Sequence, residues 1–335
     1  MPPLATRLLS SGDLVADRRL EMARDYAAAG EAIAAAELME QALELVPGWA
    51  AGWFILGEFR ETAAAGADGG EAATATTGEA STTSDAAALR AGAVAALREA
   101  LRLDPEDRCG ATLRLARLGA MPVPDAPPPA HVRDLFDGYA ERYEASLVEA
   151  LGYRGPALIE RLLDTHVPGR RFAAALDLGC GTGLVAPVIR GRVARLDGVD
   201  LAAAMVAKAR AGGLYDGLEV GDVVAAMEAR PAAGLDLITA GDVFCYLGDL
   251  TAVFAAAGRV TAPGAVFVFT TEAVDEAEGD REVVMRDSLR WAHRRSHLER
   301  VARESGFATT AIEAAVLRRD RGRDIAGHVA LFTRS

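Results

Sequence analysis

Apolar side chains recur at helical spacing through the N-terminal third of the chain. Residues 13–118 are rich in Ala, Leu and Glu, and their apolar positions are spaced as on the buried face of amphipathic helices. From residue 131 onward, short apolar runs that end in Gly or Asp alternate with helical segments. That alternation is typical of a parallel sheet with crossover helices. The pattern predicts an all-α domain followed by an α/β domain.

Two segments of the helical region can be aligned with each other. Residues 16–49 span 34 residues, and the segment that starts at Ala50 carries W-x-x-L-G from Trp53 to Gly57. A period of 34 residues and this motif are typical of tetratricopeptide repeats. Small side chains let the two helices of a repeat approach closely, and Pro47 and Pro105 close the two units alike. We therefore predict a tetratricopeptide-like helical domain over residues 13–118.

Two segments of biased composition interrupt this organisation. Residues 66–86 are rich in Gly, Thr, Ser and Ala without apolar periodicity, which predicts a disordered insert within the second repeat. Residues 119–130 contain five prolines, and proline disfavours the interior of a helix or a sheet. We interpret residues 119–130 as a linker and residues 131–335 as the second domain.

The segment ALDLGCGTGL, residues 175–184, carries the strongest chemical signal. An apolar strand ends near Asp177, and Gly179, Gly181 and Gly183 follow before a helical segment. Glycines permit positive φ and let a ligand lie against the backbone. The dinucleotide fingerprint G-x-G-x-x-G/A requires a small residue at the position of Leu184. The glycine pattern therefore favours a ligand that has no pyrophosphate.

The next strands supply further polar groups at their ends. Asp200 ends the second strand, 17 residues after Gly183, where a carboxylate can accept hydrogen bonds from both hydroxyls of a ribose. Leu201 and Met205 follow on a helix and can cover an adenine. Asp222, after the third strand, can accept from an adenine amino group. The fourth strand, residues 235–240, leads into the segment 241–244, and a fifth is expected at 265–270.

These motifs resemble those of class I S-adenosylmethionine-dependent methyltransferases. The segments ALDLGCGTG, GVDLAAAMVAKAR, EVGDV, DLITAGDVFCYLGDL and TAPGAVFVFT follow one another in the order of that family. The flanking segments are similar to a bacterial group with N-terminal tetratricopeptide repeats. The resemblance implies a Rossmann-like seven-stranded sheet with helices on both faces, whose closing hairpin adds an antiparallel strand.

The resemblance also implies a binding site for S-adenosylmethionine, with S-adenosylhomocysteine as the product. Tyr139 and Tyr143 are candidates to cover the methionine end, although both are equally typical of an ordinary helix face. The cofactor-binding residues that we expect are Tyr139, Asp177, Gly179, Cys180, Gly181, Gly183, Asp200, Leu201, Met205, Asp222, Val223 and Gly241.

Few residues are candidates for catalysis. A hydroxyl or ammonium acceptor needs a base, whereas a carboxylate acceptor does not. His293, between the fifth strand and the next helix, is the first candidate base, and His131 is the second. The position of each histidine is also compatible with a residue that orients the substrate or that is exposed to solvent. Asp242 and Tyr246 follow the fourth strand and can orient an acceptor, although Asp242 can equally cap the next turn.

Composition narrows the choice of partners. The chain has 36 basic and 48 acidic residues and a net charge of −12, which disfavours a nucleic acid as substrate. The three cysteines lack metal-type spacing, so we expect no metal site, and reduced thiols fit a cytoplasmic protein. No stretch reaches the roughly 18 apolar residues of a membrane span. We expect a cytoplasmic protein without a membrane segment.

Three hypotheses about function follow. The first is methyl transfer from S-adenosylmethionine to a small-molecule acceptor, at an oxygen. The second is a methyltransferase for a peptide, protein or carrier-bound substrate that docks on the repeat domain. That domain is also compatible with self-association or with a structural cap. The third is a non-catalytic binding protein that keeps the cofactor fold.

Overall fold

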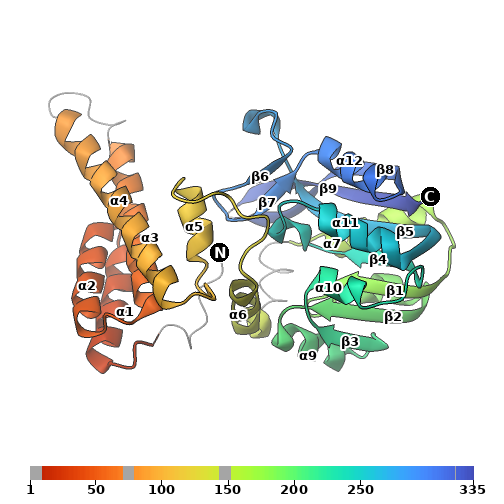
Figure 1. Ribbon diagram of the computed structural model, residues 1–335, viewed down its shortest axis with the longest axis horizontal. Helices are drawn as coiled ribbons and strands as arrows, with labels where there is room; N and C mark the ends of the chain where they lie inside the picture. Colours follow the sequence, from red (N-terminus) through yellow and green to blue (C-terminus); the bar gives the residue numbers. More distant parts are fainter. Residues whose placement is uncertain (1–9, 71–78, 143–151, 321) are drawn as a thin grey trace. The chain divides into compact units, whose positions relative to one another are not determined.

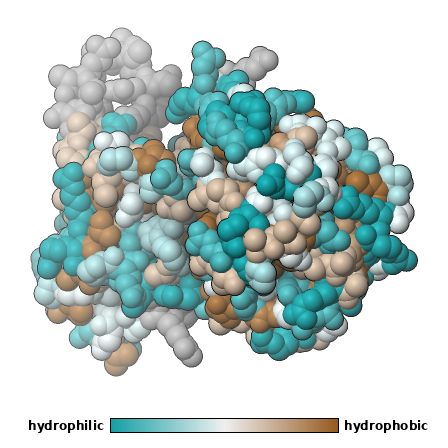
Figure 2. Space-filling model, turned by 45° about the vertical axis from the view of Figure 1, so that its right-hand side comes forward, coloured by the Kyte–Doolittle hydropathy of each residue, from teal (hydrophilic) through white to brown (hydrophobic). Residues whose placement is uncertain are grey.

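The computed structural model describes residues 10–70, 79–142, 152–320 and 322–335. The chain divides into two compact units, one that ends at His131 and one that runs from Val132 to Ser335. Hydrophilic and hydrophobic residues are interspersed on the face that Figure 2 shows. Within the described ranges, no helix combines the length and the apolar character that crossing a membrane requires.

The first unit is a succession of helices, each packed on the next along the chain. Its helices are α1 (Leu14–Ala28), α2 (Ala32–Leu45), α3 (Ala50–Gly70), α4 (Glu79–Leu103) and α5 (Ala111–Arg117). Asp13 caps α1, because its carboxylate accepts from the N–H groups of Val15 and Ala16. Alanines recur in the core of the unit, where Ala23 and Ala35 are completely buried. Small side chains therefore set the close spacing of these helices.

The predicted insert is helical at both ends. α3 continues to Gly70 and α4 begins at Glu79, so residues 66–70 and 79–86 are not the disordered loop that the composition suggested. Alanine and glutamate favour helix, and each helix is extended from a turn that already exists. Residues 71–78 lie outside the described residues. The linker is also shorter than predicted, because Pro129 opens α6 (Pro129–Tyr139), where its missing N–H is not needed.

The second unit is built on a sheet that comprises nine strands within the described residues. The strands are β1 (Phe172–Leu178), β2 (Val193–Asp200), β3 (Gly217–Val220), β4 (Leu235–Ala240), β5 (Thr261–Ala273), β6 (Val283–Met285), β7 (Trp291–His293), β8 (Phe307–Asp320) and β9 (Arg323–Arg334). The strands β3-β2-β1-β4-β5 are parallel neighbours in that order, and β9 lies antiparallel between β5 and β8. This is the predicted arrangement, with an antiparallel hairpin at the end.

Two details differ from the predicted sheet. The short pair β6–β7 joins the end of β5 and raises the strand number above the expected seven. The fifth strand begins earlier than the expected residue 265, and residues 262–264 lie inside β5 as an irregularity, where the pairing with β4 shifts between Leu235 and Leu237. Gly264, with φ of 79°, allows β5 to bend there without breaking.

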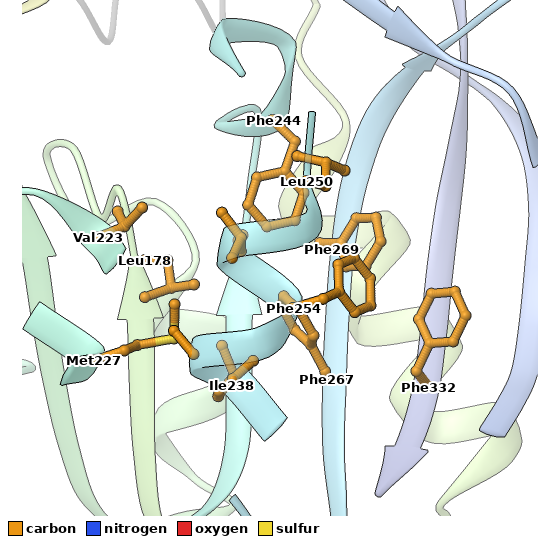
Figure 3. Packing of buried hydrophobic residues seen from close by; sticks show 14 of the residues in the cluster. Leu178, Val223, Met227, Ile238, Phe244, Leu250, Phe254, Phe267, Phe269 and Phe332 are labelled. Carbon is orange, nitrogen blue, oxygen red and sulfur yellow. The ribbon is translucent and has the colours of Figure 1, made fainter. Parts of the chain in front are cut away.

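Helices cover both faces of the sheet (Figure 1). One face packs against α10 (Val223–Glu228), α11 (Thr251–Val260) and α12 (Arg295–Glu304), and the other against α7 (Gly155–His166) and α8 (Ala186–Arg190). Aromatic rings dominate the first interface, where Phe254 of α11 meets Phe267, Phe269 and Phe332 of the sheet (Figure 3). This packing fixes α11 against β5 and β9.

The register brings the carboxyl ends of the central strands to one edge. Leu178 pairs with Val199 and with Ala240, and Ala240 pairs with Phe269. The glycine turn after β1, the end of β2 and the loop after β4 therefore lie side by side. Ligands of open parallel sheets bind at this edge, where the strand order changes direction between β1 and β4.

Candidate active site

The turn after β1 is built from three glycines with positive φ. φ is 57° at Gly179, 54° at Gly181 and 97° at Gly183, a conformation that is costly for residues with a Cβ. A Cβ on Gly179 would lie 2.5 Å from Cγ2 of Val243. The glycines thus allow both the turn itself and the close approach of the loop that follows β4.

Asp177 is fully buried at the end of β1. Its Oδ1 accepts from the hydroxyl of Thr239 and its Oδ2 from the hydroxyl of Tyr215, each at 2.6 Å. Burial raises the pKa of this carboxyl to about 6, although the two hydroxyl donors act to lower it. Both oxygens are directed at protein groups, so Asp177 fastens β1 to β4 and to the loop before β3. The structure makes it a support of the turn rather than the direct ligand that we predicted.

Cys180 also serves the turn through its backbone. Its N–H donates to the carbonyl of Val199 at 2.9 Å, which ties the turn to β2. Its thiol is buried, and burial raises its pKa, so the thiol stays protonated. Cys180 therefore offers no thiolate for chemistry.

Asp200 ends β2 beside the glycine turn, as the sequence predicts. Its Oδ2 accepts from the N–H of Gly181 and its Oδ1 from the N–H of Ala202, both at 2.9 Å. Burial raises the pKa of the carboxyl, while the two N–H donors lower it. The two N–H groups fix the orientation of the carboxylate, and each oxygen keeps a further lone pair. Asp200 is thus prepared to accept two hydroxyl donors.

Two further polar groups near Asp200 carry no sequence signal of their own. The hydroxyl of Thr182, within the glycine turn, is buried without a hydrogen-bond partner among the described residues. Asp137 of α6 accepts from the N–H of Ala204 at 2.8 Å, and its charge contributes to the raised pKa of Asp200. The buried hydroxyl and the carboxylate of Asp200 fit the polar edge of a nucleoside. The spacing of the glycines could have drawn attention to Thr182, but nothing in the sequence pointed to Asp137.

The residues expected around the adenine divide into two groups. Met205 is 1% exposed and packs with Ala140 and Ala202, so it belongs to the protein interior and does not line the edge of the sheet. Val223 is also buried in the core, at the start of α10 (Figure 3). Asp222 is exposed and caps α10 through its Oδ1. Its role toward an adenine stays a prediction, as does that of Leu201, which is half-buried.

The roles of Tyr139 and Gly241 toward the cofactor stay predictions. Tyr139 is half-buried at the end of α6, and Tyr143 lies outside the described residues. A Cβ on Gly241 would lie 2.9 Å from the hydroxyl of Tyr153 and equally close to Cγ2 of Val185. Gly241 is therefore required at least by packing within the protein.

The structure argues against both candidate bases. His293 is completely buried, its Nδ1 lies 2.7 Å from the hydroxyl of Thr271, and its Nε2 lies 2.8 Å from the carbonyl of Gly248. A carbonyl only accepts, so Nε2 carries the proton and Nδ1 accepts from Thr271. Burial lowers the pKa of His293 to about 4. Because both nitrogens are occupied, His293 is not available as a base.

His131 is also held in place. It belongs to the helical unit, is 3% exposed, and its Nδ1 lies 3.0 Å from the carbonyl of Arg108. That nitrogen must donate, since the carbonyl accepts. The prediction that His131 acts as the second candidate base is therefore not supported. Its sequence position, just after the proline-rich segment, did not reveal that its partner lies in the preceding helical region.

Asp242 takes part in an ion pair rather than in a helix cap. Its Oδ1 accepts from Arg318 Nη1 of β8 at 2.8 Å, and its N–H donates to the hydroxyl of Thr270 at 3.0 Å. Its side chain is only 6% exposed, and its φ is 60°. Because Arg318 and Arg290 occupy the two oxygens of this carboxylate, Asp242 is better placed to position its neighbours.

Comparison with known proteins agrees with this architecture. Residues 147–312 match a family model described as a methyltransferase domain. A ubiquinone biosynthesis O-methyltransferase of Hahella chejuensis is 32% identical over 108 residues, which is 31% of this chain and 44% of that protein. A malonyl-[acyl-carrier protein] O-methyltransferase of Serratia marcescens is 33% identical over 137 residues, which is 37% of this chain and 51% of that protein. The chain thus spans about half the length of these curated relatives or less.

Among solved structures, an S-adenosylmethionine-dependent methyltransferase of Mesorhizobium loti is 22% identical, with a TM-score of 0.42 over 53% of this chain and 96% of that one. The family match coincides with the strands that carry the glycine turn and Asp200. The motifs follow the order of the family, and the strand order places them at one edge of the sheet. Residues 147–312 of this chain therefore form a methyltransferase domain.

Proposed function

We propose that this protein transfers a methyl group from S-adenosylmethionine to an oxygen of a small-molecule acceptor. The observation that carries the proposal is Asp200, whose half-buried carboxylate is oriented by two backbone N–H groups beside the glycine turn. The names of the relatives, O-methyltransferases of ubiquinone biosynthesis and of a malonyl carrier protein, support oxygen as the acceptor atom.

The residues of the chain bind and position the reactants. Asp200 would accept from the ribose hydroxyls, the glycine turn would lie against the nucleoside, and Thr182 would offer its buried hydroxyl. S-adenosylmethionine supplies a methyl group on a sulfonium, which needs no further activation. Rate then depends on the alignment of the acceptor and on the exclusion of water.

α6 contacts two of the segments that follow the strands. Its Phe136 packs edge-on against the ring of Tyr246, with 5.4 Å between the centroids, and its Asp137 binds the N–H of Ala204. α6 thereby contacts the loop after β4 and the start of α9 (Ala203–Gly212). A helix fixed at these two points can keep water away from the ends of β1 and β4.

Replacement of Asp200 tests the proposal. In Asp200→Asn the loss of the charge weakens two hydrogen bonds to the ribose, so we expect the Kd for S-adenosylhomocysteine to rise roughly tenfold to a hundredfold. Isothermal titration measures it. Asp197→Asn, on the same strand, is the matched control and should bind as the unmodified protein does. Equal affinity of the Asp200 variant would refute the assignment. Tight binding without turnover on any acceptor would favour a non-catalytic role.

The helical unit supports a second candidate, a carrier-bound or protein substrate. We include in this proposal that the unit is tetratricopeptide-like, because α1–α2 and α3–α4 form two successive helix pairs with buried alanines. One group of relatives is named for an acyl-carrier-protein substrate. A unit with its own core, next to a catalytic domain, suits the docking of such a carrier.

A further inference from the structure

Buried charges gather at the ends of β4 and β5. Arg318 donates to Asp242 and to Glu272, and these three side chains are 3%, 6% and 2% exposed. Arg286 Nη1 donates to the other oxygen of Glu272 at 3.1 Å, and its Nε donates to Glu278 at 2.8 Å. Arg318 and Arg286 therefore hold both oxygens of Glu272, and Arg318 also holds Oδ1 of Asp242.

The third arginine, Arg290, has a longer ion contact than the other two, a hydrogen bond from its Nη1 to Oδ2 of Asp242. Its Nη1 lies 3.4 Å from Oδ2 of Asp242 and 3.9 Å from Oε1 of Glu272. Its Nη2 donates to the hydroxyl of Tyr246 at 2.6 Å, and the guanidinium lies over the Tyr246 ring. The side chain is 20% exposed. A guanidinium that is largely buried with only long ion contacts is stabilised when a ligand anion pairs with its fork of N–H groups.

Tyr246 adds a second donor beside Arg290. Its oxygen accepts from Arg290, so its own O–H proton is free to point elsewhere. Burial raises the pKa of Tyr246, which keeps the hydroxyl protonated. Phe136 fixes the ring from the side. The loop after β4 also touches the glycine turn, through Val243 and Gly179. The two donors are thus carried by elements that adjoin the expected cofactor.

The first predicted base, His293, is not available at this edge. Of the five histidines, all within the described residues, His293 has both nitrogens hydrogen-bonded inside the protein, and His131 belongs to the helical unit. His166 ends α7 near Glu313, and His297 lies on α12 among Arg300, Glu282 and Asp249. The backbone of His328 pairs with that of Thr271 in the sheet, and its buried Nδ1 has no hydrogen-bond partner among the described residues. An acceptor that must lose a proton is poorly served by this arrangement.

We propose that the methyl acceptor is a carboxylate, held by Arg290 and Tyr246, and that the product is a methyl ester. This inference rests on the proposed methyltransferase function and specifies its substrate class. One carboxylate oxygen donates an electron pair to form a bond to the methyl carbon. At the same time the carbon–sulfur bond breaks, and the electron pair of that bond stays on sulfur. The negative carboxylate and the positive sulfonium give a neutral ester and a neutral thioether. No proton is released, so no base is needed.

The experiment uses the full chain and methyl-labelled S-adenosylmethionine. The probes are hexanoate, benzoate and 3-phenylpropionate, each beside its matched primary alcohol. We expect labelled methyl esters, which release methanol in alkali, and no proton release in weakly buffered solution. Titration of the same carboxylates into the S-adenosylhomocysteine complex reports binding without turnover. Arg290→Gln should weaken carboxylate binding and lower kcat/KM roughly tenfold to a hundredfold. Arg290→Lys keeps the positive charge, so it should reduce carboxylate binding and kcat/KM less than Arg290→Gln does.

Arg295→Gln is the matched control, because Arg295 lies in the same basic segment but pairs with Glu299 on the surface. Arg295→Gln should leave carboxylate binding and kcat/KM unchanged. Circular dichroism checks that each variant is folded. Alkali-stable methyl ethers with one proton released per turnover would overturn the inference and keep the proposed function. Failure of all three carboxylates to bind or react would overturn the inference as well. Failure of the unmodified protein to bind S-adenosylhomocysteine would instead overturn the function itself.

Discussion

At the scale of single residues, His293 shows how burial changes the role of a side chain. The sequence places it where an acceptor is expected, yet both ring nitrogens are bonded to Thr271 and Gly248. Histidine is polar enough to suggest catalysis at any loop position. The partners that occupy its nitrogens come from β5 and from the loop after β4, 22 and 45 residues away, and no local pattern reveals them.

The titration of His293 yields a prediction about stability. The pKa of His293 is about 4 in the folded chain, against an ordinary value of 6.5. Between these two pH values His293 is therefore protonated in the unfolded chain but neutral in the folded chain. The contribution of His293 to the free energy of unfolding is fully present above pH 6.5 and is lost as the pH falls toward 4. We expect the free energy of unfolding to fall by about 2–3 kcal/mol more between about pH 7.5 and 4.5 in the unmodified protein than in His293→Gln. Urea unfolding measures it. His166→Gln serves as a control, and equal losses in all three proteins would contradict the prediction.

At the scale of elements, the glycine turn depends on contacts with the loop after β4. In Gly179→Ala the new Cβ would lie 2.5 Å from Val243 at a φ of 57°. We expect the free energy of unfolding to fall by about 2 kcal/mol, because the unfavourable φ and the close contact with Val243 both destabilise the turn. We also expect the affinity for S-adenosylhomocysteine to fall. Gly191→Ala is the control, since φ is −66° there and no atom lies within 4 Å of the new Cβ. Thermal unfolding measures the stability and titration the affinity. Equal losses of stability and affinity in both variants would contradict a specific requirement for glycine at position 179.

The strands near the glycine turn could be predicted because each is short, apolar and followed by a polar or glycine residue. The expected fourth strand, 235–240, coincides with β4, and the expected end of the second strand at Asp200 coincides with that of β2. The extra pair β6–β7 has three residues per strand, too few for a periodic pattern. The pairs of the proposed acceptor site, such as Arg290 with Tyr246, join segments that are far apart in sequence. Only the packed fold brings them together.

At the scale of the whole molecule, the chain holds separate hydrophobic cores. One contains helices of the first unit, from Ala16 to Leu115, and the others lie on the two faces of the sheet. Within the helical unit, Glu61 accepts from Arg114 and from Arg117, which ties α3 to α5. Domains with cores of their own can fold alone. The methyltransferase domain should therefore keep its cofactor site when the helices are removed.

Deletion of residues 1–125 separates the two candidate functions. We expect the remaining chain to bind S-adenosylhomocysteine within about twofold of the full protein, since Asp200 and its partners Gly181 and Ala202 all lie in the second unit. If the helices dock a carrier, kcat/KM for a carrier-bound carboxylate should fall roughly tenfold or more, because the interface energy is lost, while the free acid reacts unchanged. Steady-state kinetics on both forms measures this. A parallel loss on the free acid would assign the helices to the integrity of the catalytic domain, and unchanged rates on both would exclude docking.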